Sequence, residues 1–216
     1  MRNVPQASCW LKWVWALAAM VIMSGQPALA QDLTVSNGQQ VARVSAIGEG
    51  VVRVRIYPVD AEPEDASWAV PAEQRARRAA AQVTANSLTT PRMSVAIDPQ
   101  TLALDIRDNE GRALLSSAAE PWRAEGEGFA VRLALSNSEQ IFGMGDKTGL
   151  LNRRGRSFTN WNTDFYGFRS SDDPIYKSIP FYISSGGAGG AYGVLLDNSW
   201  RSWFDFGARE ANVLSF

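Results

Sequence analysis

The sequence predicts an all-β protein built as an antiparallel sandwich or barrel. Short segments of alternating apolar and polar residues recur along the chain, turns rich in Asp, Asn, Gly and Pro separate them, and a single segment has the composition of a helix. Short strands at such turn-punctuated intervals are typical of sandwiches and barrels. The chain contains no internal repeat and no long low-complexity tract.

Residues 1–30 have the pattern of a secretory signal peptide. Arg2 and Lys12 give a positive start, an uncharged apolar run covers residues 13–23, and Ala28–Ala30 supplies a small-x-small cleavage site. The run is shorter than the roughly 20 apolar residues that a membrane span needs, so a membrane anchor is the less favoured reading. We expect export to the periplasm or the medium, cleavage after the last of these alanines, and no membrane contact afterwards.

The remaining residues, 31–216, have the length of one domain with a core of its own. These 216 − 30 = 186 residues contain no cysteine and no histidine. Disulfides, thiol catalysis, Cys/His zinc sites and a Ser-His-acid triad are therefore excluded, and we expect neither a metal nor another cofactor. With the two basic residues of the signal removed, the net charge is 19 − 22 = −3, which gives no reason to expect nucleic acid as a partner.

The first predicted strand is Val51–Tyr57. It places three apolar side chains on one face and two arginines and a tyrosine on the other, which is the period of a half-buried strand. The helix-like composition is confined to Ala72–Gln82, which is rich in Ala, Arg, Glu and Gln. Because this segment has no apolar periodicity, a solvated loop and a short surface helix are equally compatible with it.

A hairpin is predicted in the middle of the chain. Met93–Ile97 and Leu102–Ile106 alternate, and Asp98–Gln100 (DPQ) between them favours a turn. Asp108–Gly111 (DNEG) predicts the next turn, and Phe129–Leu135 alternates again.

Two further strands are predicted toward the C-terminus. Ala191–Leu196 follows the glycine-rich segment Ser184–Gly190, and Val213–Phe216 is apolar and strand-like to the last residue. An unpaired strand edge is a liability that complete domains avoid. We therefore expect a domain over residues 31–216 that is truncated at its C-terminal end and belongs to a longer protein.

The segment Gly143–Asp164 (GMGDKTGLLNRRGRSFTNWNTD) first suggests a phosphate loop. Such a loop needs Gly-Lys-Thr, whereas Asp146 precedes Lys147 here and would repel a phosphate, and the glycine spacing also fails the dinucleotide pattern. The glycines are instead expected to set turns. Three arginines are expected to lie on a solvated turn that braces the loop, with nearby aspartates as possible partners. They are Arg153, Arg154 and Arg156, and the aspartates are Asp164, Asp172 and Asp173.

Aromatic residues are concentrated late in the chain, with 13 of the 22 between Phe158 and Phe206. Those in strand-like runs are expected to pack in a core: Phe181, Tyr192, Phe204 and Phe206. Others share a loop with amides and an acid: Trp161, Phe165, Tyr166 and Phe168. Aromatic faces beside amide and carboxylate groups suit a sugar, which offers apolar C–H faces and hydroxyls. From the residues alone, sugar contact and plain packing both remain open.

Five motifs follow one another in order between residues 139 and 207. They are Ile141–Lys147 (IFGMGDK), Trp161–Asp164 (WNTD), Asp173–Phe181 (DPIYKSIPF), Ala191–Asn198 (AYGVLLDN) and Trp200–Gly207 (WRSWFDFG). This series resembles the N-terminal region of glycoside hydrolase family 31, the α-glucosidases and α-xylosidases, with a looser match back to about residue 33. One small departure is Asp146, where the family often has Glu.

The resemblance implies a galactose-mutarotase-like β-sandwich packed against a (β/α)8 catalytic barrel of the same polypeptide. Family members are retaining, exo-acting enzymes that remove terminal α-linked glucose or xylose with two barrel aspartates. No catalytic residue is then expected in this chain, which alone should be inactive. The family's W-N-x-D aspartate reaches the bound sugar, so the resemblance assigns Asp164 to the substrate, an oligosaccharide or α-glycoside. Trp161 and Phe165 are expected to contact it too.

The leading interpretation is thus the substrate-rim and scaffold domain of an exported retaining α-glycosidase. One alternative is a standalone carbohydrate-binding sandwich without catalysis, and another is an interaction domain whose aromatic surface docks a protein. The ordered motifs and the strand-like C-terminus favour the first. The choice of glucose, xylose or another glycone would be set chiefly by barrel residues.

Overall fold

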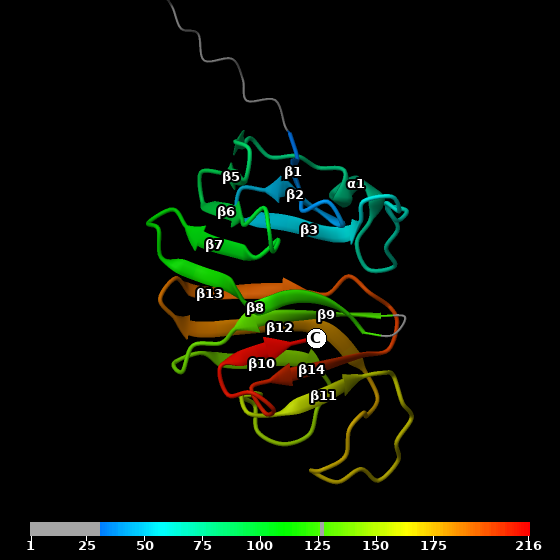
Figure 1. The fold of residues 1–216 in the computed structure, drawn as a ribbon. Coiled ribbons are helices and arrows are strands. Elements are labelled where there is room, and N and C mark those ends of the chain that lie inside the picture. The colour runs from blue at the N-terminus through cyan, green and yellow to red at the C-terminus, as the bar shows by residue number, and fades with distance from the viewer. Residues whose placement is uncertain (1–30, 126–127) are drawn as a thin grey trace, which may run out of the picture.

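The computed structural model describes residues 31–125 and 128–216, and the predicted signal segment lies outside the described residues (Figure 1). The described residues form fifteen strands and one short helix. In chain order these are β1 (Leu33–Ser36), β2 (Gln40–Gly48), β3 (Val51–Pro58), α1 (Ala72–Arg75), β4 (Gln82–Val83), β5 (Ser87–Thr89), β6 (Met93–Ile97), β7 (Leu104–Asp108), β8 (Ala113–Glu125), β9 (Gly128–Ala134), β10 (Gln140–Gly145), β11 (Ser157–Asn160), β12 (Ser178–Gly187), β13 (Gly190–Leu195), β14 (Ser202–Phe206) and β15 (Val213–Ser215).

The strands form one long sheet and two small ones. The long sheet has the order β11-β14-β15-β9-β8-β7-β6-β5-β4, and the small sheets are β1-β2-β3 and β10-β12-β13. Every pairing between these strands is antiparallel. Figure 1 shows the two small sheets at different heights along the long one, so that the molecule has two lobes. The predicted all-β antiparallel sandwich is confirmed.

Each lobe has its own hydrophobic core. In the first lobe, side chains of β1 and β2 pack on those of β5, β6 and β7, with Val44, Leu88 and Val95 fully buried. In the second lobe, β10 and β12 pack on β9, β11, β14 and β15. Leu115 and Trp122, both on the long strand β8, pack against both cores. The two lobes are therefore joined through β8.

The local strand predictions are confirmed within one or two residues. The second hairpin strand begins at Leu104 rather than Leu102, because Leu102 has a positive φ of 57° in the turn and is fully buried there. Asp98 holds this turn, since its Oδ1 accepts hydrogen bonds from the backbone N–H groups of Gln100 and Thr101 at 2.9 and 2.8 Å. The helix-like segment yields only the single turn α1, none of whose residues is buried.

The strand near the C-terminus was predicted correctly, but its pairing with other strands was not. β15 pairs with β14 on one side, where Leu214 faces Phe206, and with β9 on the other, where Leu214 faces Leu133. It is an interior strand, so the expected unpaired edge is absent at β15.

The strand aromatics divide between the core and the surface. Phe204 and Phe206 are fully buried, as expected, and Tyr192 is half-buried against the same core. Phe181 was expected to pack in the core but is 37% exposed, because it lies on the outer face of β12 while Tyr182 takes the inward position. Period-two alternation alone does not tell which face is inward when both carry aromatic residues.

Candidate functional site

The segment from Gly143 to Asp164 begins with a β-bulge where β10 approaches β12 closely. Gly143 and Gly145 have φ values of 112° and 76°, and the register between β10 and β12 shifts between them. A Cβ on Gly143 would lie 2.7 Å from the Phe181 carbonyl oxygen, and one on Gly145 would lie 2.5 Å from that of Lys177. Glycine is therefore required at both positions because the backbone has a positive φ and the strands approach closely there. This agrees with the prediction that the glycines set turns and do not bind a phosphate.

Lys147, near the start of the segment, is held in the protein interior by two polar contacts. Its side chain is fully buried, and the ammonium donates to Asp173 Oδ1 at 2.9 Å and to the Thr159 carbonyl at 2.5 Å. Burial lowers the pKa of the ammonium below its ordinary value, although the hydrogen bond and charge of Asp173 oppose that shift. Asp173 Oδ2 also accepts the backbone N–H of Thr159 at 2.5 Å, so this ion pair ties the segment to β11.

The arginines brace the loop as predicted, but through backbone carbonyls. Arg153 is buried and donates to the carbonyls of Thr148 and Leu150, while its guanidinium lies 5.5 Å from the Phe158 ring centroid. Arg156 lies over the same ring at 4.9 Å and also donates to Thr148. Among the described residues, none of the three arginines forms an ion pair with the aspartates that were named as possible partners. The predicted solvated turn is wrong for Arg153, which is buried. These contacts could not be predicted from the spacing of charged residues, because the backbone carbonyls reach the arginines only when the loop is folded.

The WNTD turn is held by Asn162 and Ser178. The Asn162 side-chain oxygen accepts the backbone N–H of Ser178 at 2.8 Å, and the Ser178 hydroxyl accepts the Trp161 N–H at 3.0 Å. Thr163 forms an isolated antiparallel bridge with Tyr176. The amide of the motif is therefore structural, and the turn presents the next acid outward.

Asp164 is exposed, and within residues 31–125 and 128–216 its carboxylate makes no hydrogen bond or ion pair. It lines a hollow of about 370 Å³ together with Asn162, Thr163, Tyr176 and Lys177. An aspartate that merely capped a turn would accept a backbone N–H near by. The interpretation of Asp164 as a turn-capping residue therefore lacks the hydrogen bond that it requires.

The other two predicted site residues lie apart from Asp164. Trp161 is 49% exposed and lines a different, larger hollow of about 860 Å³, to which Asn162 also contributes. Phe165 is 40% exposed and lines neither hollow. The structure thus brings Asp164 and Trp161 to two hollows that share Asn162, and it does not gather all three side chains at one point.

The larger hollow is also lined by two tryptophans that were not predicted as site residues, although Trp200 opens the last of the five motifs. Trp68 comes from the loop between β3 and α1, and Trp200 from the turn between β13 and β14. They are 95% and 81% exposed. Both stand beside serine in segments without apolar alternation, Ser67-Trp68 and Ser199-Trp200, a signal that could have marked them as surface aromatics.

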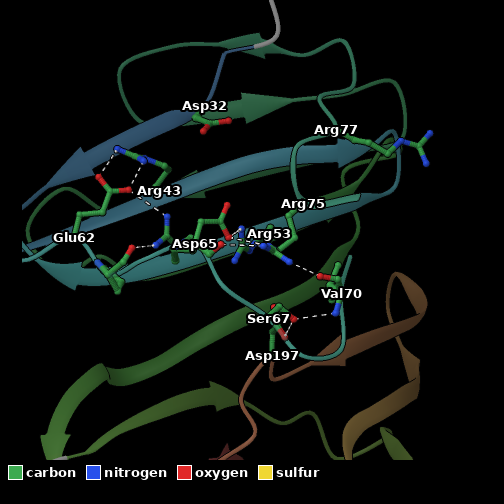
Figure 2. A network of polar contacts seen from close by, with 12 residues as sticks. Asp32, Arg43, Arg53, Glu62, Asp65, Ser67, Val70, Arg75, Arg77 and Asp197 are labelled. Carbon is green, nitrogen blue, oxygen red and sulfur yellow. Dashed lines mark hydrogen bonds and ion pairs between the residues drawn. The ribbon is translucent and has the colours of Figure 1, made fainter. Parts of the chain in front are cut away.

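A network of ion pairs fixes the loop that carries Trp68 (Figure 2). Glu62 pairs with Arg43 at 2.5 Å, and Asp65 pairs with Arg53 and Arg75 at 2.8 and 2.9 Å. Burial raises the pKa of Asp65, but the hydrogen bonds and charges of the two arginines outweigh it, so the pKa lies below its ordinary value.

At its far end this loop reaches the second lobe. The Ser67 hydroxyl donates to Asp197 Oδ1 at 2.5 Å and also accepts the Val70 N–H at 2.9 Å. Asp197 follows β13 in the chain. The side of the hollow that carries Trp68 is therefore fixed at both ends by polar contacts.

Among the described residues, no helix is long and apolar enough to cross a membrane, and no group of three or more acidic, histidine or cysteine side chains is placed to hold a metal ion.

Together, the long sheet with two smaller sheets packed on it and the exposed aromatic loop define a galactose-mutarotase-like β-sandwich domain. The chain belongs to the family of glycosyl hydrolase 31 N-terminal galactose mutarotase-like domains, whose pattern matches residues 41–205. The predicted family membership is confirmed.

Known proteins similar to this chain are considerably longer. Alpha-glucosidase 2 of Bacillus thermoamyloliquefaciens is 28% identical over 171 residues, 77% of this chain and 22% of that protein. Alpha-xylosidase XylQ of Lactiplantibacillus pentosus is 35% identical over 85 residues, 39% of this chain and 10% of that protein. A dextranase structure from Flavobacterium johnsoniae, in complex with isomaltotriose, aligns with a TM-score of 0.71 at 26% identity over 86% of this chain and 24% of that one. The chain spans less than a quarter of each.

Proposed function

We propose that this chain is the N-terminal substrate-rim and scaffold domain of an exported, retaining α-glycosidase that removes terminal α-linked glucose or xylose. The names of the relatives support this substrate class, since they include an alpha-glucosidase and an alpha-xylosidase, and the dextranase was solved with isomaltotriose. The short span of the chain within these relatives supports its role as one domain of a larger enzyme.

The observation that carries the rim role is the exposed Asp164 carboxylate. A carboxylate without protein partners can accept charge-assisted hydrogen bonds from sugar hydroxyls, which are stronger than bonds between neutral groups. The Asn162 side-chain oxygen accepts the Ser178 N–H, and the Thr163 hydroxyl donates to the Trp161 carbonyl at 3.3 Å, whereas the Asp164 carboxylate has no partner among the described residues. Trp161 and Phe165, both partly exposed, flank it in sequence.

The scaffold role is supported by the outer face of β12. Ile179, Phe181 and Ile183 occupy alternate positions there and are 50%, 37% and 42% exposed, and Leu195 of the neighbouring β13 is 43% exposed. A contiguous apolar strip of this kind marks a protein contact in a soluble protein. The proposed occupant is the catalytic barrel of the same polypeptide.

The 216-residue chain, assayed by itself, is expected to release no glucose or xylose from aryl α-glycosides above the rate in buffer. The family places the nucleophile and the acid/base aspartates on the barrel, and a hydrolysis that needs both cannot proceed without them. The matched control is the full-length polypeptide that contains this chain and the barrel, which should hydrolyse at least one of the two substrates. Hydrolysis by the chain alone, or no hydrolysis by the full-length protein, would contradict the proposed function.

Export is proposed from the signal pattern of residues 1–30. The exported protein is expected to begin at Gln31, because cleavage after Ala30 follows the small-x-small rule. Intact-mass measurement of material collected outside the cytoplasm checks this, with Ala30→Pro as the variant that should block cleavage. Exported protein that still carries Met1 would refute it.

A further inference from the structure

The loop between β3 and α1, residues 59–71, takes no part in either hydrophobic core. None of its residues, all of which lie in the described part of the chain, is buried, and none is among the hydrophobic side chains that form the two cores or pack against them. Segments with few buried apolar contacts open more readily than the cores beside them. This loop, here called the clasp loop, therefore depends on polar contacts for its position.

The clasp loop and the surface that it crosses carry opposite charges. The loop contains four acidic residues and no basic one, namely Asp60, Glu62, Glu64 and Asp65. The surface carries four arginines, namely Arg43 of β2, Arg53 and Arg55 of β3, and Arg75 of α1. The carboxylates of Glu62 and Asp65 each pair with two of these arginines, at 2.5–3.2 Å (Figure 2). Opposite charges therefore hold the loop on this surface.

The arginines also bind the backbone of the clasp loop. Arg55 donates to the Pro63 carbonyl at 2.5 Å. Arg75 donates to the carbonyls of Asp65 and Val70. The side chains of the two paired acids remain 42% and 48% exposed, so dissolved ions reach these contacts. Exposed ion pairs are individually weak, and salt screens them.

The far end of the clasp loop places Trp68 beside the WNTD motif. The Ser67 hydroxyl donates to Asp197 Oδ1 of the second lobe at 2.5 Å. The next residue, Trp68, lines the larger hollow together with Trp161 and Asn162. Because the Trp68 side chain is 95% exposed, it has little packing of its own. Its position is therefore set by the loop, and the position of the loop is set by the ion pairs.

We propose that the clasp loop is a salt-sensitive device: at low ionic strength it holds Trp68 at the substrate rim, and at high ionic strength it detaches while both cores stay folded. The Debye length falls from about 10 Å at about 0.1 M salt to about 3 Å at about 1 M, which screens the carboxylates from the arginines. Regulation of the rim rests on the proposed function. Detachment itself rests on the opposite charges, on their exposure and on the lack of core contacts within the described residues.

The first test follows the motion of the clasp loop in the full 216-residue chain by ¹⁵N relaxation. At about 0.05 M NaCl the backbone amides of residues 59–71 should have order parameters close to about 0.85, and at about 1 M NaCl these should fall below about 0.6. The amides of β6 and β9 serve as internal controls. Their order parameters should not change, so the loss of order is confined to the loop.

Two variants link this motion to the ion pairs. Glu62→Gln/Asp65→Asn removes both paired carboxylates and keeps the size of the side chains, so the clasp loop should be mobile already at low salt. Glu110→Gln is the matched control, because it removes an exposed carboxylate that pairs with Arg112 at 3.1 Å outside the loop. It should leave the order parameters of the loop and their response to salt unchanged.

The second test measures the effect of the clasp loop on the full-length α-glycosidase. The kcat/KM of the wild type should fall several-fold between low and high salt as Trp68 leaves the rim. Glu62→Gln/Asp65→Asn should have the lower value at both salt concentrations. Trp68→Ala should also have a low value, and neither salt nor the double substitution should lower it further, because the ring that the loop positions is gone.

The outcomes of the two tests are separable. Loop order parameters that respond neither to salt nor to the double substitution overturn the proposal, and so does a loss of order in β6 and β9 together with the loop. A loop that detaches while kcat/KM keeps its value overturns the regulatory role, because Trp68 then has no part at the rim. A full-length protein that hydrolyses no α-glycoside contradicts the proposed function, whereas the relaxation result still decides whether the loop detaches.

Discussion

Replacing Asp164 with asparagine is expected to lower kcat/KM of the full-length α-glycosidase by about 10- to 150-fold. The reason is the loss of a charge-assisted hydrogen bond to a sugar hydroxyl, worth roughly 1.5–3 kcal/mol. A loss of that size in transition-state binding converts directly into the stated range of kcat/KM. The measurement is steady-state kinetics on the best aryl α-glycoside of the enzyme.

The same variant is expected to leave Tm almost unchanged, because the Asp164 carboxylate has no hydrogen bond or ion pair within the described residues. Asp172→Asn is the matched control in the same region. The Asp172 carboxylate accepts the Arg169 backbone N–H at 2.6 Å, so asparagine can replace it locally and activity should persist. Full kcat/KM in Asp164→Asn would remove the functional assignment of this loop.

Replacing Asp173 with alanine is expected to lower the free energy of unfolding by about 3–5 kcal/mol, the usual cost of breaking a buried ion pair from one side. Lys147 would keep a fully buried ammonium with the Thr159 carbonyl but without its counter-charge. Urea unfolding of the chain, read with its m-value, measures the change.

Two further variants make this test specific. The double variant Lys147→Met/Asp173→Leu should recover much of the loss, because apolar replacement of both partners removes the buried charge altogether. Asp146→Ala is the exposed control, since Asp146 pairs with Lys177 at 3.8 Å on the surface, and such pairs contribute only about 0–1 kcal/mol. If Asp173→Ala lowers the free energy of unfolding by no more than Asp146→Ala does, the buried ion pair does not stabilise the segment.

The parts of the fold that could be predicted are those set by neighbouring residues. Alternation identified β3 and β9, and the turn at Asp98 followed from an aspartate that bonds N–H groups two and three residues on. What could not be predicted depends on residues far apart in sequence. β15 was expected to leave an unpaired edge, whereas its partner β9 lies some eighty positions earlier, with Val213 facing Ala134.

The candidate site was likewise predicted only in part. The WNTD motif directed attention to Asp164 and Trp161, and the structure leaves both exposed. Trp68 escaped notice because only the folded chain brings it to the same hollow as Trp161 and Trp200. Arg153 was assigned to a solvated turn because three arginines near a glycine look hydrophilic, although its guanidinium is buried on Phe158. Contacts with backbone carbonyls leave no trace in a residue pattern.

The sharing of β8 by the two lobes sets where this protein can be divided. Leu115 and Trp122 line both cores, and the Trp122 indole also bonds the Leu102 carbonyl of the first lobe. A fragment that contained the first lobe without β8 would lack two side chains that pack against its core. A fragment that contained the second lobe without β8 would lack the same two side chains. The smallest unit that an engineer can transplant or circularly permute is therefore the pair of lobes, and any new termini belong in the surface turns rather than between the lobes.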